Sequence, residues 1–243
     1  MSKNVNELYE LLSDALRREV AKNRLAGASI RIRCTPLESE AAIGRPEHRD
    51  YPIILGKEKM IEAEFKGARG QAFTDHFRNA DYTIDEFMAM QPDDNWKRAH
   101  YIAGLNAVFR YLDLCDKTVH CKDAEPVTCA RMLAEKYTAE EKVLLIGLQP
   151  RFLEHLSGAT NVRVIDLDAD NVGTVKFGVP VEPVANTGEA ISWCDRLLVT
   201  GSTIVNGSIT SFLQLGKPVF FYGVTISAPA LILGFDVYCG CGR

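Results

Sequence analysis

The stretch Lys142-Val-Leu-Leu-Ile-Gly-Leu-Gln-Pro-Arg-Phe-Leu-Glu-His-Leu-Ser157 decides the fold class. It opens with a continuous apolar run that ends at a glycine, which is typical of a parallel strand buried on both faces. A short helix is expected over residues 151–156, and the apolar run at residues 162–165 predicts a second strand. This alternation of strand and helix predicts a parallel sheet with helices packed on its faces.

The same alternation continues through the rest of the sequence. Strands are predicted at residues 196–199, 218–222 and about 235–238, and helices at residues 209–215 and 228–233. We therefore expect the second half of the chain to form a Rossmann-like, doubly wound parallel sheet.

The first half has a different pattern. Residues 4–26 carry apolar side chains at steps of three and four, which predicts an amphipathic helix, and residues 28–34 alternate as a half-buried strand does. A short strand is expected at residues 62–66, followed by a glycine-marked loop at residues 67–74. Thr83-Ile-Asp-Glu86 fits a capping box that opens a helix over residues 83–90, and a longer helix is predicted at residues 94–112. A further helix is predicted at residues 127–137, beyond this half. A helix followed by antiparallel strands favours a small α+β domain, so we predict domains at residues 1–115 and 116–243.

Composition limits the function classes. The 243 residues are 47% hydrophobic and 25% charged, with a net charge of −4, which is typical of a globular protein and not of a nucleic-acid binder. The uncharged apolar run at residues 218–235 is at the lower limit for a membrane span and is interrupted by Gly223 and Pro229, so a buried strand, a turn and a short helix explain it better. The polar start predicts no signal peptide, and seven cysteines without a framework spacing favour a reducing, cytoplasmic location.

A polar turn follows one predicted strand in Leu197-Leu-Val-Thr-Gly-Ser-Thr-Ile-Val-Asn-Gly-Ser208. Ligands of open α/β sheets bind at the carboxyl ends of strands, and glycine lets a backbone approach a ligand closely. We therefore predict that the turn binds ligand oxygens through Thr200, Gly201, Ser202, Thr203 and Asn206.

Three further residues of the second half are candidate ligand contacts. The turn Gly147-Leu-Gln-Pro-Arg151 has one glycine where a dinucleotide fold needs three, which disfavours NAD or FAD. Gln149 would supply a donor and Arg151 a positive charge. Asp166 lies 19 residues after Gly147, where a ribose-binding acid would sit. With Asp168 and Asp170 it could also bind a hard metal ion or form a turn.

The first half and the segment that follows it supply the other candidates. Gln71 and Thr74 would close a cleft from the first domain, because binding residues concentrate on loops. Asn106, on a predicted helix, either caps a neighbouring loop or touches a ligand. His120 and Cys121 are candidate catalytic or ligating groups. The final Cys239-Gly-Cys241 leaves metal binding open.

A set of short motifs runs through the sequence from about residue 38 to the end. They are Gly44-x-Pro46-Glu47, Gly56-Lys-Glu58, Gly70-Gln-Ala-Phe-Thr74, Asn106-Ala107, Thr118-Val-His-Cys-Lys-Asp123, Ile146-Gly-Leu-Gln-Pro-Arg151, Asp166-Leu-Asp168, Asn171-x-Gly173 and Thr200-Gly-Ser-Thr-x-x-Asn-Gly207. Together they resemble the putative heavy-metal-chelation family of uncharacterised prokaryotic proteins. The resemblance implies an enolase-N-terminal-like domain followed by a Rossmann-like domain, with an active site in the cleft between them.

These observations lead to two hypotheses of function. The first is a protein that binds or processes an anionic small molecule or a metal chelate in the interdomain cleft, with a metal ion or chelate as the candidate cofactor. The alternative is an enzyme that uses S-adenosylmethionine or a nucleotide, with Asp166 on the ribose. Neither nucleic acid nor a membrane is expected as a partner. Whether a bond is broken and whether the chain forms a homo-oligomer stay open.

Overall fold

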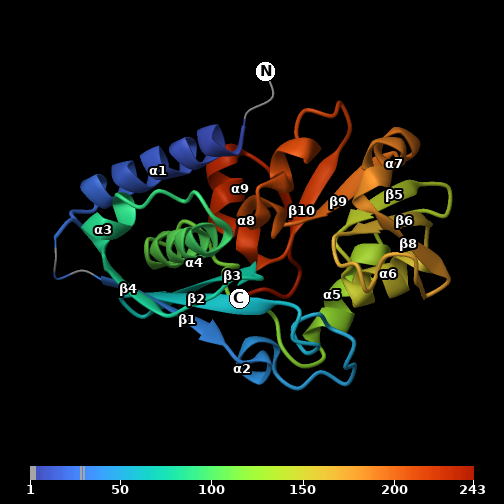
Figure 1. Cartoon of the computed structure of the whole chain (residues 1–243), viewed down its shortest axis with the longest axis horizontal. Helices are drawn as coiled ribbons and strands as arrows, with labels where there is room; N and C mark the ends of the chain where they lie inside the picture. Colours follow the sequence, from blue (N-terminus) through green and yellow to red (C-terminus); the bar gives the residue numbers. More distant parts are fainter. Residues whose placement is uncertain (1–3, 28, 30) are drawn as a thin grey trace.

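The computed structural model describes residues 4–27, 29 and 31–243 and contains two β-sheets with helices between them (Figure 1). The first sheet is antiparallel and has the order β3-β2-β1-β4. Its strands are β1 (Arg31–Leu37), β2 (Lys59–Phe65), β3 (Ala68–Thr74) and β4 (Ala80–Thr83). The helices of this half are α1 (Val5–Lys22), α2 (Ser39–Ile43), α3 (Ile84–Met88) and α4 (Asn95–Tyr111).

The long helices of the first half are confirmed, and each begins at a capping residue. Asn4 accepts a hydrogen bond from the backbone N–H of Glu7, and Asp94 accepts one from Lys97. Thr83 forms the expected capping box with Glu86. The strand predicted at residues 28–34 is present as β1 from Arg31 on; positions 28 and 30 lie outside the described residues.

The prediction of a loop at residues 67–74 is wrong, because this segment is strand β3. Lys66 and Gly67 form a two-residue hairpin turn with φ of 50° and 85°, the left-handed values that a type I′ turn requires. Gly70 marks a close approach, since a Cβ at this position would overlap the backbone of Ala103 and Ala107 on α4. The glycines thus serve a turn and a tight packing contact.

The second sheet has the order β11-β10-β9-β5-β6-β8-β7 and is parallel except for the edge strand β7. Its strands are β5 (Lys142–Ile146), β6 (Asn161–Asp166), β7 (Val175–Lys176), β8 (Val179–Pro183), β9 (Arg196–Thr200), β10 (Val219–Tyr222) and β11 (Asp236–Tyr238). The parallel strands follow the order 3-2-1-4-5-6 of a doubly wound sheet, which confirms the predicted fold class.

The helices of this half are short. They are α5 (Glu125–Ala134), α6 (Pro150–Ser157), α7 (Thr187–Trp193), α8 (Thr203–Asn206) and α9 (Ser227–Leu233), with 3₁₀ turns at Val184–Asn186, Ser208–Phe212 and Val224–Ile226. The prediction of a helix at residues 209–215 is wrong: this segment overlaps the 3₁₀ turn Ser208–Phe212, and the α-helix α8 lies just before it. Gly207, with φ of 82°, ends α8 because a left-handed residue cannot continue the helix. The sequence also missed the β7–β8 hairpin.

Each face of the parallel sheet packs against different elements. Because side chains alternate along a strand, Val143 and Leu145 of β5 face α5 and α6, whereas Leu144 and Ile146 face the opposite side. On that opposite side, one hydrophobic cluster extends through α7, α9 and α4 to α1 and the antiparallel sheet. The two sheets therefore share a continuous core, and the domain division at residue 115 stays a prediction.

The side chain of Asn106 joins the two halves inside this core. Its amide nitrogen donates to the carbonyl oxygens of Gln71, Val224 and Thr225 at 3.0–3.3 Å, and its amide oxygen accepts from the N–H of Ala228 at 2.8 Å. The side chain is fully buried. Of the two roles predicted for Asn106, the structure supports the capping of neighbouring backbone and places the residue away from any open space.

None of the helices that the structure describes has the length and apolar content that crossing a membrane requires.

Candidate functional site

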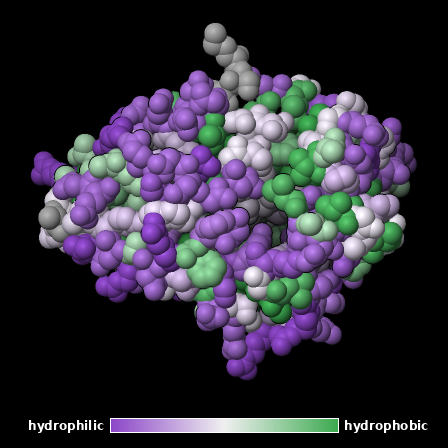
Figure 2. All heavy atoms as spheres, in the orientation of Figure 1, coloured by the Kyte–Doolittle hydropathy of each residue, from purple (hydrophilic) through white to green (hydrophobic). Residues whose placement is uncertain are grey.

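A cavity of about 590 Å³ lies between the two halves of the molecule. Its second-half wall is made by the carboxyl ends of β5, β6, β9 and β10, and its other wall by residues 51–58 and 73–75. The chain leaves β5 and β9, which are neighbours in the sheet, in opposite directions, so the cavity lies at the switch point where doubly wound sheets bind ligands. Figure 2 shows the molecular surface hollowed between the two halves.

Nine of the thirteen residues predicted for the site line this cavity. They are Thr74, His120, Cys121, Gln149, Asp166, Thr200, Ser202, Thr203 and Asn206. The other four, Gln71, Asn106, Arg151 and Gly201, do not contribute to the lining. Six of the nine lie at or after the carboxyl ends of parallel strands, as expected from the rule that ligand-binding groups gather at the ends of such strands. Thr74, His120 and Cys121 do not follow a parallel strand, so this rule does not predict them.

The turn after β9 places hydroxyl groups at the cavity, and some of these hydroxyls form hydrogen bonds within the turn itself. The hydroxyl of Thr203 donates to the carbonyl oxygen of Thr200 at 2.7 Å, and Thr200 donates to the hydroxyl of Ser202 at 3.3 Å. Asn206 accepts from both the N–H and the hydroxyl of Ser208. Ser202 is thus the group of this turn best placed to donate to a ligand, because its own hydroxyl proton has no described acceptor.

Position 201 is occupied by glycine because of tight packing, and it does not line the cavity. A Cβ at this position would lie 2.9 Å from both the Cβ and the backbone nitrogen of Ile226. The turn after β9 therefore packs directly on the turn after β10.

The turn after β5 caps its helix, and its arginine points away from the cavity. Gln149 accepts a hydrogen bond from the N–H of Phe152 at the start of α6. Arg151 is 2% exposed and pairs with Asp50 at 2.5 Å and Glu154 at 2.6 Å. These two carboxylates neutralise the charge of Arg151, and the pair with Asp50 joins the segment around Asp50 to α6. The positive charge that the sequence predicted for an anionic ligand is absent from the cavity lining.

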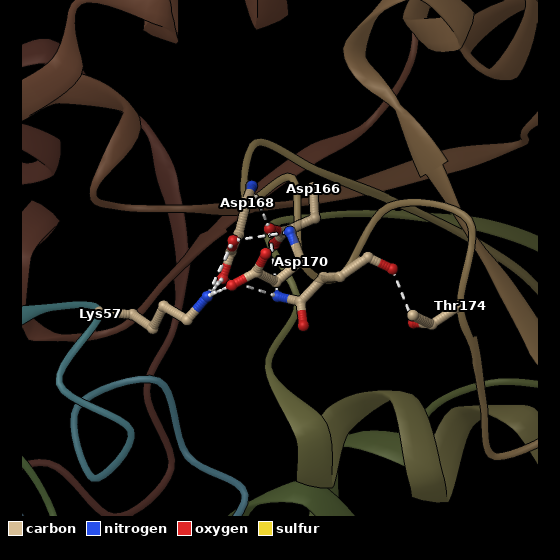
Figure 3. Close-up of polar contacts among 6 residues, drawn as sticks. Lys57, Asp166, Asp168, Asp170 and Thr174 are labelled. Carbon is tan, nitrogen blue, oxygen red and sulfur yellow. Dashed lines mark hydrogen bonds and ion pairs between the residues drawn. The ribbon is translucent and has the colours of Figure 1, made fainter.

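The aspartates after β6 form consecutive turns (Figure 3). Asp166 accepts from the N–H groups of Leu148 at 2.6 Å and Asp168 at 2.7 Å, and Asp168 accepts from the N–H of Asp170 at 3.0 Å. Such bonds from a carboxylate to a backbone N–H two residues on are those of an Asx-turn. Both oxygens of Asp166 thus hold the β5 and β6 turns in place.

A lysine from the first half neutralises part of this acidic turn. Figure 3 shows Lys57 reaching across to Asp168 and Asp170. Its ammonium lies 3.1 Å from Asp168 and also forms an ion pair with Asp170. Burial alone would raise the pKa of Asp168, but hydrogen bonds from Asp170 and Lys57 hold that pKa below its ordinary value. Lys57 therefore ties the two cavity walls together.

Glu58 and Asp75 are acidic residues of the lining that were not predicted from the sequence. The carboxyl of Glu58 is the more strongly perturbed. Burial and, to a smaller extent, the negative charges of Asp166, Asp75 and Asp168 together raise the pKa of this carboxyl to about 7. The carboxyl groups therefore share one region of the cavity, and near neutral pH Glu58 holds a proton part of the time. Bound cations would lower this pKa, because opposite charge favours the ionised form.

His120 lines the cavity, and one of its ring nitrogens has a free lone pair. Its Nδ1 lies 2.6 Å from the carbonyl oxygen of Cys121, which can only accept, so Nδ1 carries the proton and Nε2 the lone pair. Burial lowers the pKa of His120, which keeps the ring neutral at physiological pH. The backbone N–H of His120 donates to the side chain of Gln71 at 2.7 Å. Gln71 thus positions His120 from outside the cavity.

Cys121 is not arranged as an activated nucleophile. Burial raises the pKa of its thiol far above the ordinary value, and the neighbouring thiols of Cys129, Cys239 and Cys241 raise it further. Its sulfur lies 3.8 Å from Nδ1 of His120, but that nitrogen carries the proton bonded to the carbonyl of Cys121. A catalytic thiolate requires a lowered pKa, so the geometry favours His120 over Cys121 as the reactive or ligating group.

Among the residues that the structure describes, no three His, Cys, Asp or Glu side chains converge in the manner of a metal site.

Two comparisons found proteins that this chain is similar to. Residues 132–233 match the family described as "Putative heavy-metal chelation" (DUF364). A crystal structure of a DUF364 protein of unknown function from Pyrococcus horikoshii is 14% identical, with a TM-score of 0.51 over 88% of this chain and 79% of that one. A DUF364 structure of unknown function from Desulfitobacterium hafniense is 11% identical, with a TM-score of 0.48 over 67% of this chain and 66% of that one.

The sequence matches no curated protein. The likeness to the Pyrococcus structure shows the fold alone, and it extends over both sheets. Residues 132–233, from the end of α5 to the end of α9, match the family that the short motifs resemble, the family of putative heavy-metal chelation.

Proposed function

We propose that this protein binds an organic small molecule that carries a metal ion or a positive charge, in the cavity between its two sheets. The observation that carries the proposal is the charge of the lining. Glu58, Asp75, Asp166 and Asp168 contribute carboxylates, whereas Lys57 is the single lysine or arginine of the lining within the described residues. The ammonium of Lys57 is already paired.

The size and composition of the cavity support an organic ligand. A volume of about 590 Å³ exceeds what a bare metal ion needs and falls in the range of sites for small molecules. Apolar groups such as Phe73, Phe152, Phe212 and Val224 line it together with the polar ones. A metal chelate fits this combination, because its organic part would contact apolar walls while its cation lies near the carboxylates.

The sequence analysis left two ligand classes open, an anionic small molecule and a metal chelate, and the charge of the lining favours the chelate. A free anion would face several carboxylates with no unpaired cation to offset them, at a cost in Coulomb energy. A chelate with a metal ion would face the same groups favourably. Nε2 of His120 is the neutral nitrogen that could complete the coordination of such a metal, since neutral imidazole is a common metal ligand.

The alternative, an enzyme that uses S-adenosylmethionine, keeps one supporting observation. Asp166 lies at the end of β6, next to the switch point, as a ribose-binding acid would. Its oxygens already accept from Leu148 and Asp168, which leaves only their remaining lone pairs for a ribose. The positively charged sulfonium would suit the acidic lining.

We also propose a cytoplasmic location and a division into domains at residues 1–115 and 116–243, the second Rossmann-like. All seven cysteines are free, which suits a reducing compartment. The two sheets use separate parts of the sequence, residues 31–83 and 142–238, which supports the division.

Thermal unfolding with a panel of probes tests the proposal. A cationic nickel(II)–histidine chelate at about 100 times its Kd should stabilise the protein by about 2.7 kcal/mol. For a chain of this size that corresponds to a rise in Tm of about 5 to 10 °C. Citrate, a trianion of similar size, should give no rise. S-adenosylmethionine tests the alternative, and elemental analysis of protein purified without added metal tests for a bound metal directly.

A matched pair of variants connects the response to the cavity. Glu58→Gln removes a carboxylate from the lining and should weaken the response to the nickel chelate. Glu64→Gln changes an exposed glutamate of β2 that does not line the cavity, and the response should persist. A response to citrate that exceeds the response to the chelate would contradict the charge argument.

A further inference from the structure

Four cysteines from three separate segments gather at one end of the cavity. They are Cys121, which precedes α5, Cys129 on α5, and the Cys239–Cys241 pair after β11. Three of them, Cys121, Cys129 and Cys239, line the cavity. Cys241 packs against the hydrophobic cluster that contains Cys129. The thiols are close enough for the charge of one to raise the pKa of another.

The segment that follows β11 is held in this position by several bonds. The backbone of Arg243 donates to and accepts from Val119 at 2.9 and 2.7 Å, and it also accepts from Thr118. The guanidinium of Arg243 pairs with Glu125 at the start of α5. Tyr238 donates its hydroxyl to the carbonyl oxygen of Cys129 at 2.7 Å. The position of residues 239–243 against α5 is thus fixed by backbone and side-chain contacts on both sides.

Among the four clustered cysteines, Cys129 and Cys241 are the pair whose side chains interact by more than charge alone. The side chain of Cys241 packs on the cluster that contains Cys129 and lies within hydrogen-bonding reach of the Cys129 thiol. Gly240 passes over Cys129 so closely that a Cβ on it would lie 3.3 Å from the sulfur. Cys34 and Cys194 lie outside the cluster, and their thiols donate to the carbonyl oxygens of His100 and Ile191.

We propose that Cys129 and Cys241 form a two-thiolate site for a soft d¹⁰ cation of the Cu(I) class. Thiolates are soft ligands that select such cations, and monovalent Cu(I) accepts two thiolates in a linear arrangement. Two donors suffice for this geometry, in agreement with the lack of a three-donor cluster in the described part of the chain. The site does not depend on the identity of the cavity ligand.

Binding at this site transfers no electrons. Two S–H bonds break and two sulfur–copper bonds form, while the bonds between Cu(I) and its carrier ligands break. The two protons pass to the buffer or to the released carrier. Cys129 lines the cavity and Cys241 is partly exposed, so a carrier could approach the pair.

An anaerobic titration of the reduced protein with Cu(I), in competition with a colorimetric Cu(I) chelator, tests the proposal. The unsubstituted chain should withdraw one equivalent of Cu(I). Cys129→Ser and Cys241→Ser should each lower the affinity by more than about 100-fold, because each removes a direct ligand and not merely a supporting group, whose loss costs 10- to 100-fold. Cys115→Ser is the matched control, a partly exposed cysteine outside the cluster, and should bind as the unsubstituted chain does.

Further variants and a spectroscopic measurement make the test decisive. Thermal melts without metal check that each variant is folded, and Cys241→Ser changes a partly exposed position close to the last residue of the sequence. X-ray absorption of the Cu(I) complex should find two sulfur ligands. Full retention of Cu(I) by Cys129→Ser and Cys241→Ser, loss only in Cys121→Ser or Cys239→Ser, or three or more protein ligands would each overturn the proposal.

Discussion

Residues 67–74 and residues 200–208 look alike in the sequence, since each combines two glycines with hydroxyl and amide side chains, but they differ in structure. The first segment is strand β3 with its turn, and Gly70 and Gln71 lie in the interior. The second is a turn and a short helix whose Thr200 and Ser202 line the cavity. A glycine in such a segment can therefore indicate close packing as readily as a ligand.

The structural context of each segment accounts for the difference. β3 is an edge strand that pairs with β2 along its whole length, and on its other edge the N–H groups of Gln71 and Phe73 donate to Thr118 and Thr225. Its backbone groups are therefore used inside the protein, and its glycine meets a helix. The second segment follows the last paired residue of β9, where backbone groups are released from the sheet. Substitutions in β3 should therefore affect stability most, and substitutions in the turn after β9 should affect ligand binding most.

Gly70→Ala should cause the largest loss of stability. The added Cβ overlaps backbone atoms of Ala103 and Ala107, which cannot move aside as a flexible side chain would. We expect the free energy of unfolding to fall by about 3 kcal/mol, at the upper end of the cost of overpacking. Urea denaturation measures the change.

Gly188→Ala is the control for this substitution. Gly188 lies in α7, and a Cβ there meets no heavy atom within 4 Å. Alanine should raise the free energy of unfolding there by up to about 1 kcal/mol, because it is the better helix former. Equal effects at positions 70 and 188 would show that β3 does not pack on α4 as described.

Glu58→Gln should change the pH dependence of stability. The folded-state pKa of about 7 lies above the ordinary value of 4.5, so the folded state binds more protons than the unfolded state between these pH values. The stability contributed by Glu58 is therefore fully present below about pH 4.5 and is lost as the pH rises through 7.

The glutamine variant should lack this loss. Between pH 5 and pH 8 we expect it to gain about 2 kcal/mol relative to the unsubstituted protein, less than the full shift implies because water in the cavity screens the charge. Urea denaturation across this range measures the gain, with Glu64→Gln as the control. A constant difference between the two proteins over the whole range would contradict a raised pKa at Glu58.

The sequence predicted the parallel sheet well because its signals are local. Each buried strand, such as residues 143–146, is a continuous apolar run, and each run ends where the chain turns. The β7–β8 hairpin has no such run: its strands contain two and five residues, and Val175 and Lys176 are exposed. Short exposed strands depend on tertiary contacts that a local pattern does not record.

The cavity was predicted in part for the same reason. Thr200, Ser202 and Asp166 follow strands directly, so the ends of strands located them. The role of Arg151 is set by Asp50, which is 101 positions away in the sequence. Lys57 and Glu58 lie in a segment without helix or strand, and only the packing of that segment against the second sheet brings them to the cavity.

Gly201→Ala should have an intermediate effect that distinguishes packing from binding. Its Cβ would meet Ile226 at 2.9 Å, which the turn after β10 can relieve only by a small shift. We expect a loss of about 1 to 2 kcal/mol in the free energy of unfolding, measured by urea denaturation, with the thermal response to the nickel chelate retained. Loss of that response at unchanged stability would instead show that the backbone of residue 201 contacts the ligand.

Ser202→Ala should have the smallest effect on stability and a clear effect on binding. The hydroxyl of Ser202 accepts only a long bond from Thr200 at 3.3 Å, so its removal should cost less than about 0.5 kcal/mol of stability. If the hydroxyl donates to the ligand, its loss should weaken binding of the nickel chelate by about 1 kcal/mol, which titration calorimetry can measure. Ser192→Ala, which removes a hydroxyl bonded to Gly188 on α7, is the matched control and should leave binding unchanged. Equal binding by both variants would place the ligand away from the turn after β9 and would leave the carboxylate wall as its main contact.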